Sequence, residues 1–147
     1  MTKSPAARPR PLIPNKVCPV VLRSRATGRE ILAFTHPRAG CQLVKGTIEP
    51  NESVEAAALR ELSEEAGLTE ARVVRQLGVW PSGHQGQVWA FVECKPAKPL
   101  PDSWSHHAGD DGGHEFKFFW YRLHDRTAAT RWHPLFRHAL KFIEKRV

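Results

Sequence analysis

One segment, residues 46–68, constrains the fold of this chain more than any other, and it reads GTIEPNESVEAAALRELSEEAGL. Turn formers near its start, Pro50 and Asn51, give way to an alanine-rich run of helix-favouring residues that stops at Gly67. Glycine suits the left-handed position that follows a helix. The pattern therefore predicts a helix over residues 52–66 that begins directly after a turn.

The predicted helix carries three acidic residues on one side. Glu61, Glu64 and Glu65 stand at positions i, i+3 and i+4, so their carboxylates project within about a 100° arc. Like charges at this spacing destabilise an isolated helix by about 0.2–0.5 kcal/mol per pair. A divalent cation such as Mg²⁺, which prefers oxygen ligands, would compensate them. The stripe alone does not decide between a metal site and an ordinary solvated helix face.

The rest of the chain predicts a sheet with a second helix. Runs rich in β-branched and aromatic residues indicate strands, and an amphipathic stripe near the C-terminus indicates a helix. Strands combined with two non-adjacent helices indicate an α/β fold, a mixed sheet covered by helices. A long loop is expected at residues 95–113, which contain three prolines. The expected strands are residues 17–24, 30–36, 71–80, 86–94 and 115–123, and the second helix is 132–146.

Length and composition indicate a single intracellular domain. The chain has 147 residues, and residues 1–15 hold four prolines among basic and small residues. We expect a flexible basic arm there, ahead of one domain at residues 16–147. Three cysteines without CxxC spacing argue against a disulfide framework and a thiolate zinc site. Without a signal-peptide pattern or about 18 consecutive apolar residues, we expect a cytoplasmic protein with no membrane contact.

The formal net charge of +7 is concentrated at the two ends of the chain. Residues 1–16 and residues 131–147 carry +4 each, whereas the residues between them carry −1. A basic arm and a basic helix face indicate a nucleic-acid groove less strongly than a basic body would. Nucleic-acid binding is therefore the less favoured expectation.

The amino-acid sequence of residues 46–68 is similar to the signature of the Nudix hydrolases. Gly46, five residues, Glu52, seven residues and then RELSEEAGL match that signature at every specified position. The resemblance implies an α/β/α sandwich in which helices flank a mixed β-sheet. It also implies a hydrolase that cleaves the phosphoanhydride bond of a nucleoside diphosphate linked to another group. The implied cofactor is Mg²⁺, with Mn²⁺ as a substitute, the implied partner is a nucleotide-type small molecule, and a homodimer is among the implied assemblies.

The resemblance assigns roles to residues by their places in the motif. Glu61, Glu64 and Glu65 match the metal-binding glutamates of the family, and the carbonyl of Lys45 matches an additional ligand. Glu61 and Glu64 are also candidate catalytic residues, because some members use a carboxylate of this helix to take a proton from the attacking water. The residues expected to hold the loop against the helix are Gly46, Glu52, Arg60 and Gly67.

Outside the motif, the sequence offers alternative candidates for the catalytic and substrate-binding residues. Other members take the catalytic base from a downstream loop, and Glu115 is the first candidate here, ahead of Asp110 and Asp111. Arg38, His36 and Lys45 are expected to meet substrate phosphates, with ordinary surface charges as the alternative. Trp104, in the expected long loop, is the candidate for stacking on a base.

Two other functions remain open at this point. A catalytically silent nucleotide-binding sensor would keep the fold, but it would be expected to lose motif carboxylates that this chain retains. An RNA-binding module, including one for RNA 5′ ends, would use the basic arm and the C-terminal helix, and its affinity would fall steeply with salt.

Overall fold

The computed structural model describes residues 11–109, 113–125 and 131–147. Asp110, Asp111 and most of the expected basic arm lie outside these ranges. The elements, in chain order, are β1 (Lys16–Arg25), β2 (Gly28–His36), β3 (Gly40–Gln42), β4 (Gly46–Thr47), α1 (Val54–Ala66), β5 (Ala71–Pro81), β6 (Val88–Pro96), β7 (Trp104–Ala108), β8 (His114–Arg122) and α2 (Pro134–Glu144).

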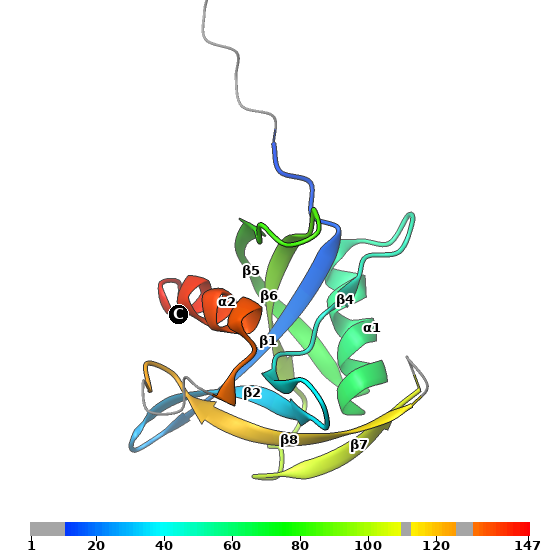
Figure 1. Cartoon of the computed structure of the whole chain (residues 1–147). Coiled ribbons are helices and arrows are strands. Elements are labelled where there is room, and N and C mark those ends of the chain that lie inside the picture. Colours follow the sequence, from blue (N-terminus) through cyan, green and yellow to red (C-terminus); the bar gives the residue numbers. More distant parts are fainter. Residues whose placement is uncertain (1–10, 110–112, 126–130) are drawn as a thin grey trace, which may run out of the picture.

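The strands form one mixed sheet in the order β5-β6-β1-β2-β8-β7, with β3 paired to β2 and β4 to β1. β1 runs parallel to β6 from Lys16 to Val21, and the other pairings are antiparallel. From Leu22 onward β1 pairs with β2 instead. Figure 1 shows the two helices on opposite sides of this sheet, which confirms the expected α/β fold with helices on both faces.

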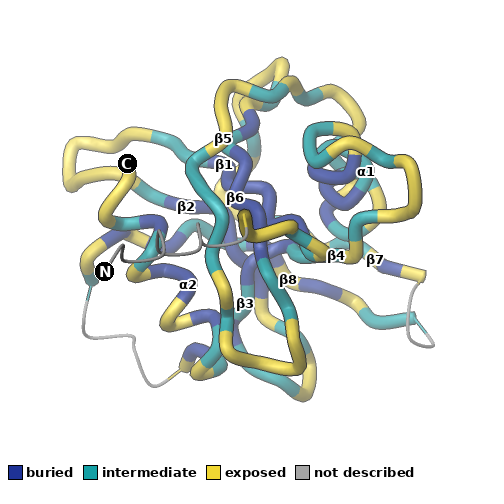
Figure 2. The backbone as a smooth tube through the Cα atoms, turned by 90° about the horizontal axis from the view of Figure 1, so that it is seen from above, coloured by how far each residue is buried: buried dark blue, intermediate teal, exposed yellow. Residues whose placement is uncertain are grey.

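Each helix covers its own part of the core. Under α1, the side chains of Ala58 and Leu62 pack with Val17 and Val92 of the central strands. Under α2, the apolar stripe packs against the other face of β1, β2 and β6. Figure 2 shows the buried segments gathered between the helices and along the central strands. Within the described ranges, neither helix has the length and apolar character needed to cross a membrane.

The helix α1 begins two residues later than the sequence predicts. Ser53 is its N-cap, because the Ser53 hydroxyl accepts a hydrogen bond from the amide of Ala56 at 3.0 Å. Glu52 therefore lies just outside the helix, where its carboxylate accepts from the amide of Glu49. The predicted end is confirmed, since Gly67 has φ 73° and follows the last helical residue.

The expected long loop at residues 95–113 is wrong in part, because it contains the strand β7 (Trp104–Ala108). The sequence WSHHA has no β-branched residue, so no local pattern marks it as a strand. Its conformation comes from the antiparallel ladder with β8. The ring of Trp104 also stacks on Phe118, with centroids 5.1 Å apart and planes 9° apart. Tertiary pairing therefore decides the structure here.

Candidate active site

Arg60 is the centre of a polar network that ties the loop before α1 to the helix. Its Nε donates to Oε2 of Glu52 at 2.7 Å, and its Nη2 donates to Oε1 of the same carboxylate at 2.8 Å. Nη2 also donates to the carbonyl of Thr47 at 2.8 Å. A two-pronged bond between guanidinium and carboxylate fixes orientation as well as distance. The residues between Thr47 and Arg60 are thereby held in one conformation.

The same guanidinium also binds the acidic stripe of α1. Its Nη1 donates to Oε1 of Glu61 at 2.8 Å and to Oε2 of Glu64 at 3.2 Å. The arginine thus compensates part of the repulsion between neighbouring carboxylates. The expectation that a cation must balance this stripe is met in part by a residue of the chain itself.

This network sets the protonation of its members. The hydrogen bonds from Arg60, and then the one from the Glu49 amide, lower the pKa of Glu52 to about 2. Conversely, the hydrogen bond to Glu52 is the largest cause that raises the pKa of Arg60. Both groups are therefore charged throughout the neutral pH range.

Gly46 allows the carboxylate of Glu61 to lie directly against the backbone. Glu61 is 5% exposed, the one charged residue among those buried in the described structure. A Cβ added at Gly46 would lie 1.9 Å from Cδ and Oε1 of Glu61, far inside any real contact. The position requires glycine because of this close approach. The peptide that Lys45 and Gly46 share is consequently next to the Glu61 carboxylate.

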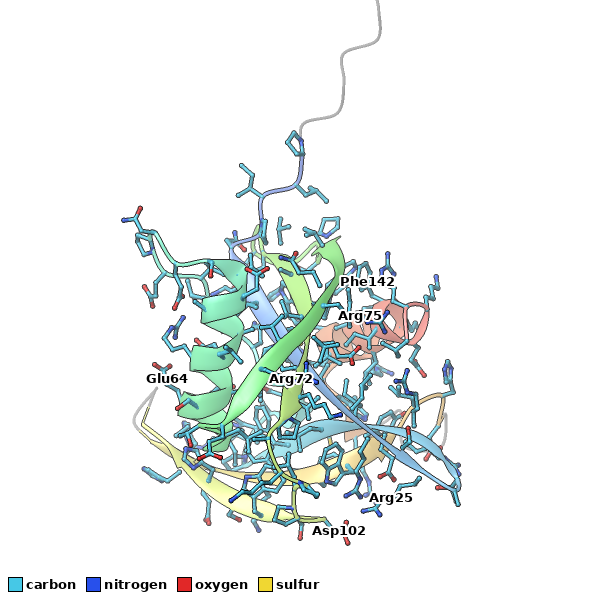
Figure 3. All side chains as sticks on the ribbon, turned by 180° about the vertical axis from the view of Figure 1, so that it is seen from behind. Arg25, Glu64, Arg72, Arg75, Asp102 and Phe142 are labelled. Atoms are coloured by element: carbon cyan, nitrogen blue, oxygen red, sulfur yellow. The ribbon has the colours of Figure 1, made fainter. Side chains whose placement is uncertain are left out.

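The other two glutamates of the stripe point to different surroundings. The side chain of Glu64 is 48% exposed, and Figure 3 shows it at the outer side of α1. Glu65 instead lines a cavity of about 360 Å³, which we call the histidine cavity. Its lining residues are Phe34, His36, Ala39, Gln42, Leu43, Lys45, Glu65, His84, Ala108, His114, Phe116, His133, Leu135 and Phe136.

Lys45 brings a positive charge to the histidine cavity. Its Nζ donates to Oε1 of Gln87 at 3.1 Å and lies 4.9 Å from the centre of the Trp89 ring. Burial, and next the charge of Lys16, lower the pKa of Lys45, while Cys18 and Glu65 oppose this shift. The cavity is thus lined by the amine of Lys45, from the β3–β4 connection, and by the carboxylate of Glu65, from α1.

Four histidines lie on the wall of this cavity, and the sequence singled out only His36 among them as a phosphate contact. His36 ends β2, His84 lies between β5 and β6, His114 begins β8 and His133 caps α2. The rings of His36 and His114 are 4.9 Å apart and tilted. Because these residues come from four separate segments, no local spacing in the sequence could bring them together.

The residues proposed outside the motif occupy different places. The exposed Arg38 lies in the turn after β2, and its amide donates to Nδ1 of His36, which lines the cavity. The side chain of Trp104, the first residue of β7, lies against the end of α1, where its Nε1 donates to the carbonyl of Ala66 at 3.1 Å. Neither side chain lines the histidine cavity, and their binding of substrate stays a prediction.

Glu115 is exposed on β8. Its neighbours His114 and Phe116 line the histidine cavity. Since successive side chains of a strand point to opposite faces, Glu115 projects away from that cavity. The structure does not bring Glu115 to the carboxylates of α1, and its role as a base stays a prediction.

The described residues contain no group of three histidine, cysteine, aspartate or glutamate side chains already arranged to hold a metal ion. The three glutamates share one side of α1, but Arg60 binds two of them. A carboxylate can accept about four hydrogen bonds, so one bond from Arg60 does not saturate it. The donor set remains one of hard oxygen atoms, the type that Mg²⁺ and Mn²⁺ prefer.

The chain matches a known protein family over most of its length. The profile described as the NUDIX domain matches residues 15–141, which is most of the chain. The chain belongs to the Nudix family. The resemblance of residues 46–68 to the Nudix signature is therefore confirmed over a full domain. Among curated proteins, no sequence matches this Nudix hydrolase.

Solved structures show the same fold at low sequence identity. An Ap4A hydrolase from C. elegans has a TM-score of 0.64 and 19% identity, over 91% of this chain and 96% of that one. A Nudix hydrolase from M. smegmatis has a TM-score of 0.61 and 18% identity, over 90% and 84%. An ADP-ribose pyrophosphatase from Streptococcus suis has a TM-score of 0.57 and 16% identity, over 92% and 94%. This Nudix domain therefore has the fold of enzymes named for different pyrophosphate substrates.

Proposed function

We propose that this Nudix hydrolase cleaves the phosphoanhydride bond of a nucleoside diphosphate linked to another group, and that it depends on Mg²⁺, with Mn²⁺ as a substitute. The observation that carries the proposal is the placement of Glu65 and Lys45 on one cavity, beside the glutamates that Arg60 holds. The carboxylates along α1 suit the metal ion that accompanies a pyrophosphate substrate. The side chain of Lys45 in the neighbouring cavity suits its phosphate groups.

Three side chains and one carbonyl would hold the cation. Glu61, Glu64 and Glu65 supply carboxylate oxygens, and the Lys45 carbonyl lies on the peptide against which Glu61 packs. When bound, the cation would neutralise the pyrophosphate and lower the pKa of the attacking water. The oxygen donors and the close approach at Gly46 fit such an ion.

The cavity supplies the substrate contacts. The side chain of Lys45 would bind a phosphate oxygen, since it is the one lysine or arginine among the residues lining the cavity. The rings of Phe34, Phe116 and Phe136 make much of the remaining wall. Aromatic walls with a few polar groups suit a nucleoside. These contacts would fix the phosphates towards Glu65.

The proton of the attacking water would pass to a carboxylate of α1. Glu61 is buried and accepts a hydrogen bond from Arg60, whereas Glu64 is half exposed at the outer side of α1. Glu115 projects from the far face of β8 and would act only if the substrate or β8 moved. We therefore expect Glu64→Gln to remove activity and Glu115→Gln to retain it.

The test is a hydrolysis assay on the purified protein with Mg²⁺ or Mn²⁺. The panel contains nucleoside triphosphates, dinucleoside polyphosphates, ADP-ribose, nucleoside diphosphate sugars and triphosphorylated RNA, and product masses locate the cleaved bond. We expect at least one substrate to be cleaved, and Glu64→Gln and Glu65→Gln to lower turnover by about 100-fold or more.

Glu70→Gln is the matched control, because Glu70 is exposed just beyond α1 and makes the same change of charge. It should retain full activity. A folded protein that binds nucleotides but forms no product with either metal would contradict the proposal. That result would support the nucleotide-binding sensor instead.

A further inference from the structure

A second cavity, of about 540 Å³, lies at the other end of β1 from the glutamates of α1. It occupies the point where β1 leaves β6 and begins to pair with β2. We call it the fork cleft, and its walls are residues 22–25 with Arg29 on one side, residues 93–100 on the other, and Trp120. The fork cleft shares no lining residue with the histidine cavity, so the two cavities are separate sites.

The fork cleft is rich in cations, and part of them are neutralised within the protein. Arg23 donates to Glu30 at 2.7 Å and to Asp102 at 2.8 Å, and Arg25 donates to Asp102 at 3.0 Å. The guanidinium of Arg23 also covers the ring of Trp120, 4.3 Å from its centre. These contacts hold the two arginine side chains in place, and the two carboxylates balance their charges.

Three further cations have no such compensation. Arg29, Lys95 and Lys98 are exposed, and none of them forms an ion pair within the described ranges. They reach the cleft from both walls, Arg29 from β2 and the two lysines from β6 and the segment after it. Like charges that converge on one cavity repel one another, so an anion between them would be favourable.

The excess of positive charge continues along the sheet. Arg72 of β5 lies opposite Lys95 in the strand register, while the next arginine, Arg75, is bound by Glu93 at 3.0 Å. Figure 3 shows Arg72 and Arg75 along β5, and Arg25 close to Asp102 at the lower end of the molecule. The basic surface is thus broader than one phosphate group.

We propose that the fork cleft is a second anion-binding site, which binds phosphate groups of a phosphorylated ligand through Arg29, Lys95 and Lys98. Guanidinium and ammonium groups are the usual protein partners of phosphate. The apolar wall formed by Leu22, Leu100 and Trp120 leaves room for the organic part of such a ligand. The phosphates belong either to a nucleic-acid chain or to a small molecule, and the experiment separates these two sources.

The test measures binding in the presence of EDTA, which removes metal ions and stops hydrolysis at α1. The probes are a labelled ten-nucleotide uridine RNA without terminal phosphates, and inorganic phosphate. The test variant combines Arg29→Gln, Lys95→Gln and Lys98→Gln. The control variant combines Arg137→Gln, Lys141→Gln and Lys145→Gln, three exposed cations of α2 and its C-cap, and changes the net charge equally.

Three phosphate contacts predict a slope of about −2 in log affinity against log salt for a single strand, an approximately 20-fold loss between about 50 and 200 mM. We expect the wild type and the α2 control to bind the RNA with this dependence. The fork variant should bind at least about tenfold more weakly at about 50 mM, with a slope near zero. Its melting temperature and its hydrolytic activity on a small substrate should be unchanged.

If inorganic phosphate binds to the wild type and the control but not to the fork variant, the site takes isolated phosphate groups, and the proposal also stands. The proposal is overturned if neither probe binds to the wild type. Equal binding by the wild type and the fork variant, or an equal loss in the α2 control, overturns it too. None of these outcomes depends on hydrolysis at α1.

Discussion

Replacing Gly46 with alanine should displace the carboxylate of Glu61 and so disable the site. The added Cβ would lie 1.9 Å from Oε1 and 2.3 Å from Oε2 of that carboxylate, whereas real Cβ contacts do not fall below 3.0 Å. Gly46 does not have a left-handed φ, so the strain comes from this contact alone. The carboxylate must move, and it then loses its 2.8 Å hydrogen bond from Arg60.

Two effects set the size of the loss. Overpacking against a buried side chain such as that of Glu61 costs about 1–3 kcal/mol, and a hydrogen bond to a charged group contributes about 1.5–3 kcal/mol. Because the displaced side chain regains hydration, we expect a total of about 2–4 kcal/mol. For a domain of this size that lowers the melting temperature by about 5–15 °C. Turnover should fall to the level of Glu61→Ala.

Urea and thermal unfolding of four proteins measure this effect: the wild type, Gly46→Ala, Glu61→Ala and the double variant. If the clash is with Glu61, Gly46→Ala should cost less than about 1 kcal/mol once that side chain is absent. Gly109→Ala is the control, because its Cβ would meet nothing within 4 Å and its φ is not left-handed. Wild-type stability and turnover in Gly46→Ala, or the same loss in both backgrounds, would refute the reasoning.

Three further predictions follow from contacts and burial. The pKa of Glu52 is about 2, below its ordinary value, so its stabilising effect is complete above about pH 4.5 and is lost as the pH falls towards 2; Glu52→Gln should flatten this part of the acid-unfolding curve measured by circular dichroism. Burial raises the pKa of Cys18 and of Cys41, and that of Cys94 to about 12; because all three thiols are also buried, a thiol reagent at about pH 8 should label no cysteine in the native protein and all of them after denaturation. Trp104→Phe keeps the aromatic stack but loses the bond to the Ala66 carbonyl, which should lower the free energy of unfolding in urea by about 0.5–1.5 kcal/mol.

The sequence predicts α1 well because the signals that define it are local. The apolar spacing, the acidic stripe and Gly67 lie within one segment, and the structure confirms the helix with its left-handed glycine. The start was misplaced by two residues, since both Glu52 and Ser53 could begin a helix. The hydroxyl of Ser53 decides the boundary by binding the Ala56 amide.

The interactions of Arg60 could be anticipated only in part. The motif led us to expect that Glu52 and Arg60 hold the loop against the helix, and in the structure these two side chains, eight positions apart, form a direct ion pair. The charge pattern pointed to a metal ion as the partner of the glutamates, whereas the guanidinium itself reaches Glu61 and Glu64. The spacing of residues in the sequence predicts which side chains share a side of a helix. The rotamer of a long arginine side chain depends instead on every hydrogen-bond acceptor around it.

Features assembled from distant segments were beyond sequence reasoning. The four histidines of the histidine cavity come from the ends of β2 and β8, the β5–β6 connection and the cap of α2. The strand β7 forms only because β8 pairs with it. In both cases the contacts join residues from separate segments of the chain, and no local sequence pattern around these residues predicts them.

The position of β1 also has a consequence for how the protein is made. This strand lies within the sheet, but its parallel partner β6 follows roughly seventy residues later in the chain. A nascent chain that has emerged only as far as Leu68 contains every residue of the acidic motif and also β1, yet it lacks β6, the other central strand on which α1 packs. The packing of α1 on the sheet is therefore complete only after residues 88–96 have left the ribosome. A peptide of residues 46–68 transplanted to another protein would carry the motif without its geometry.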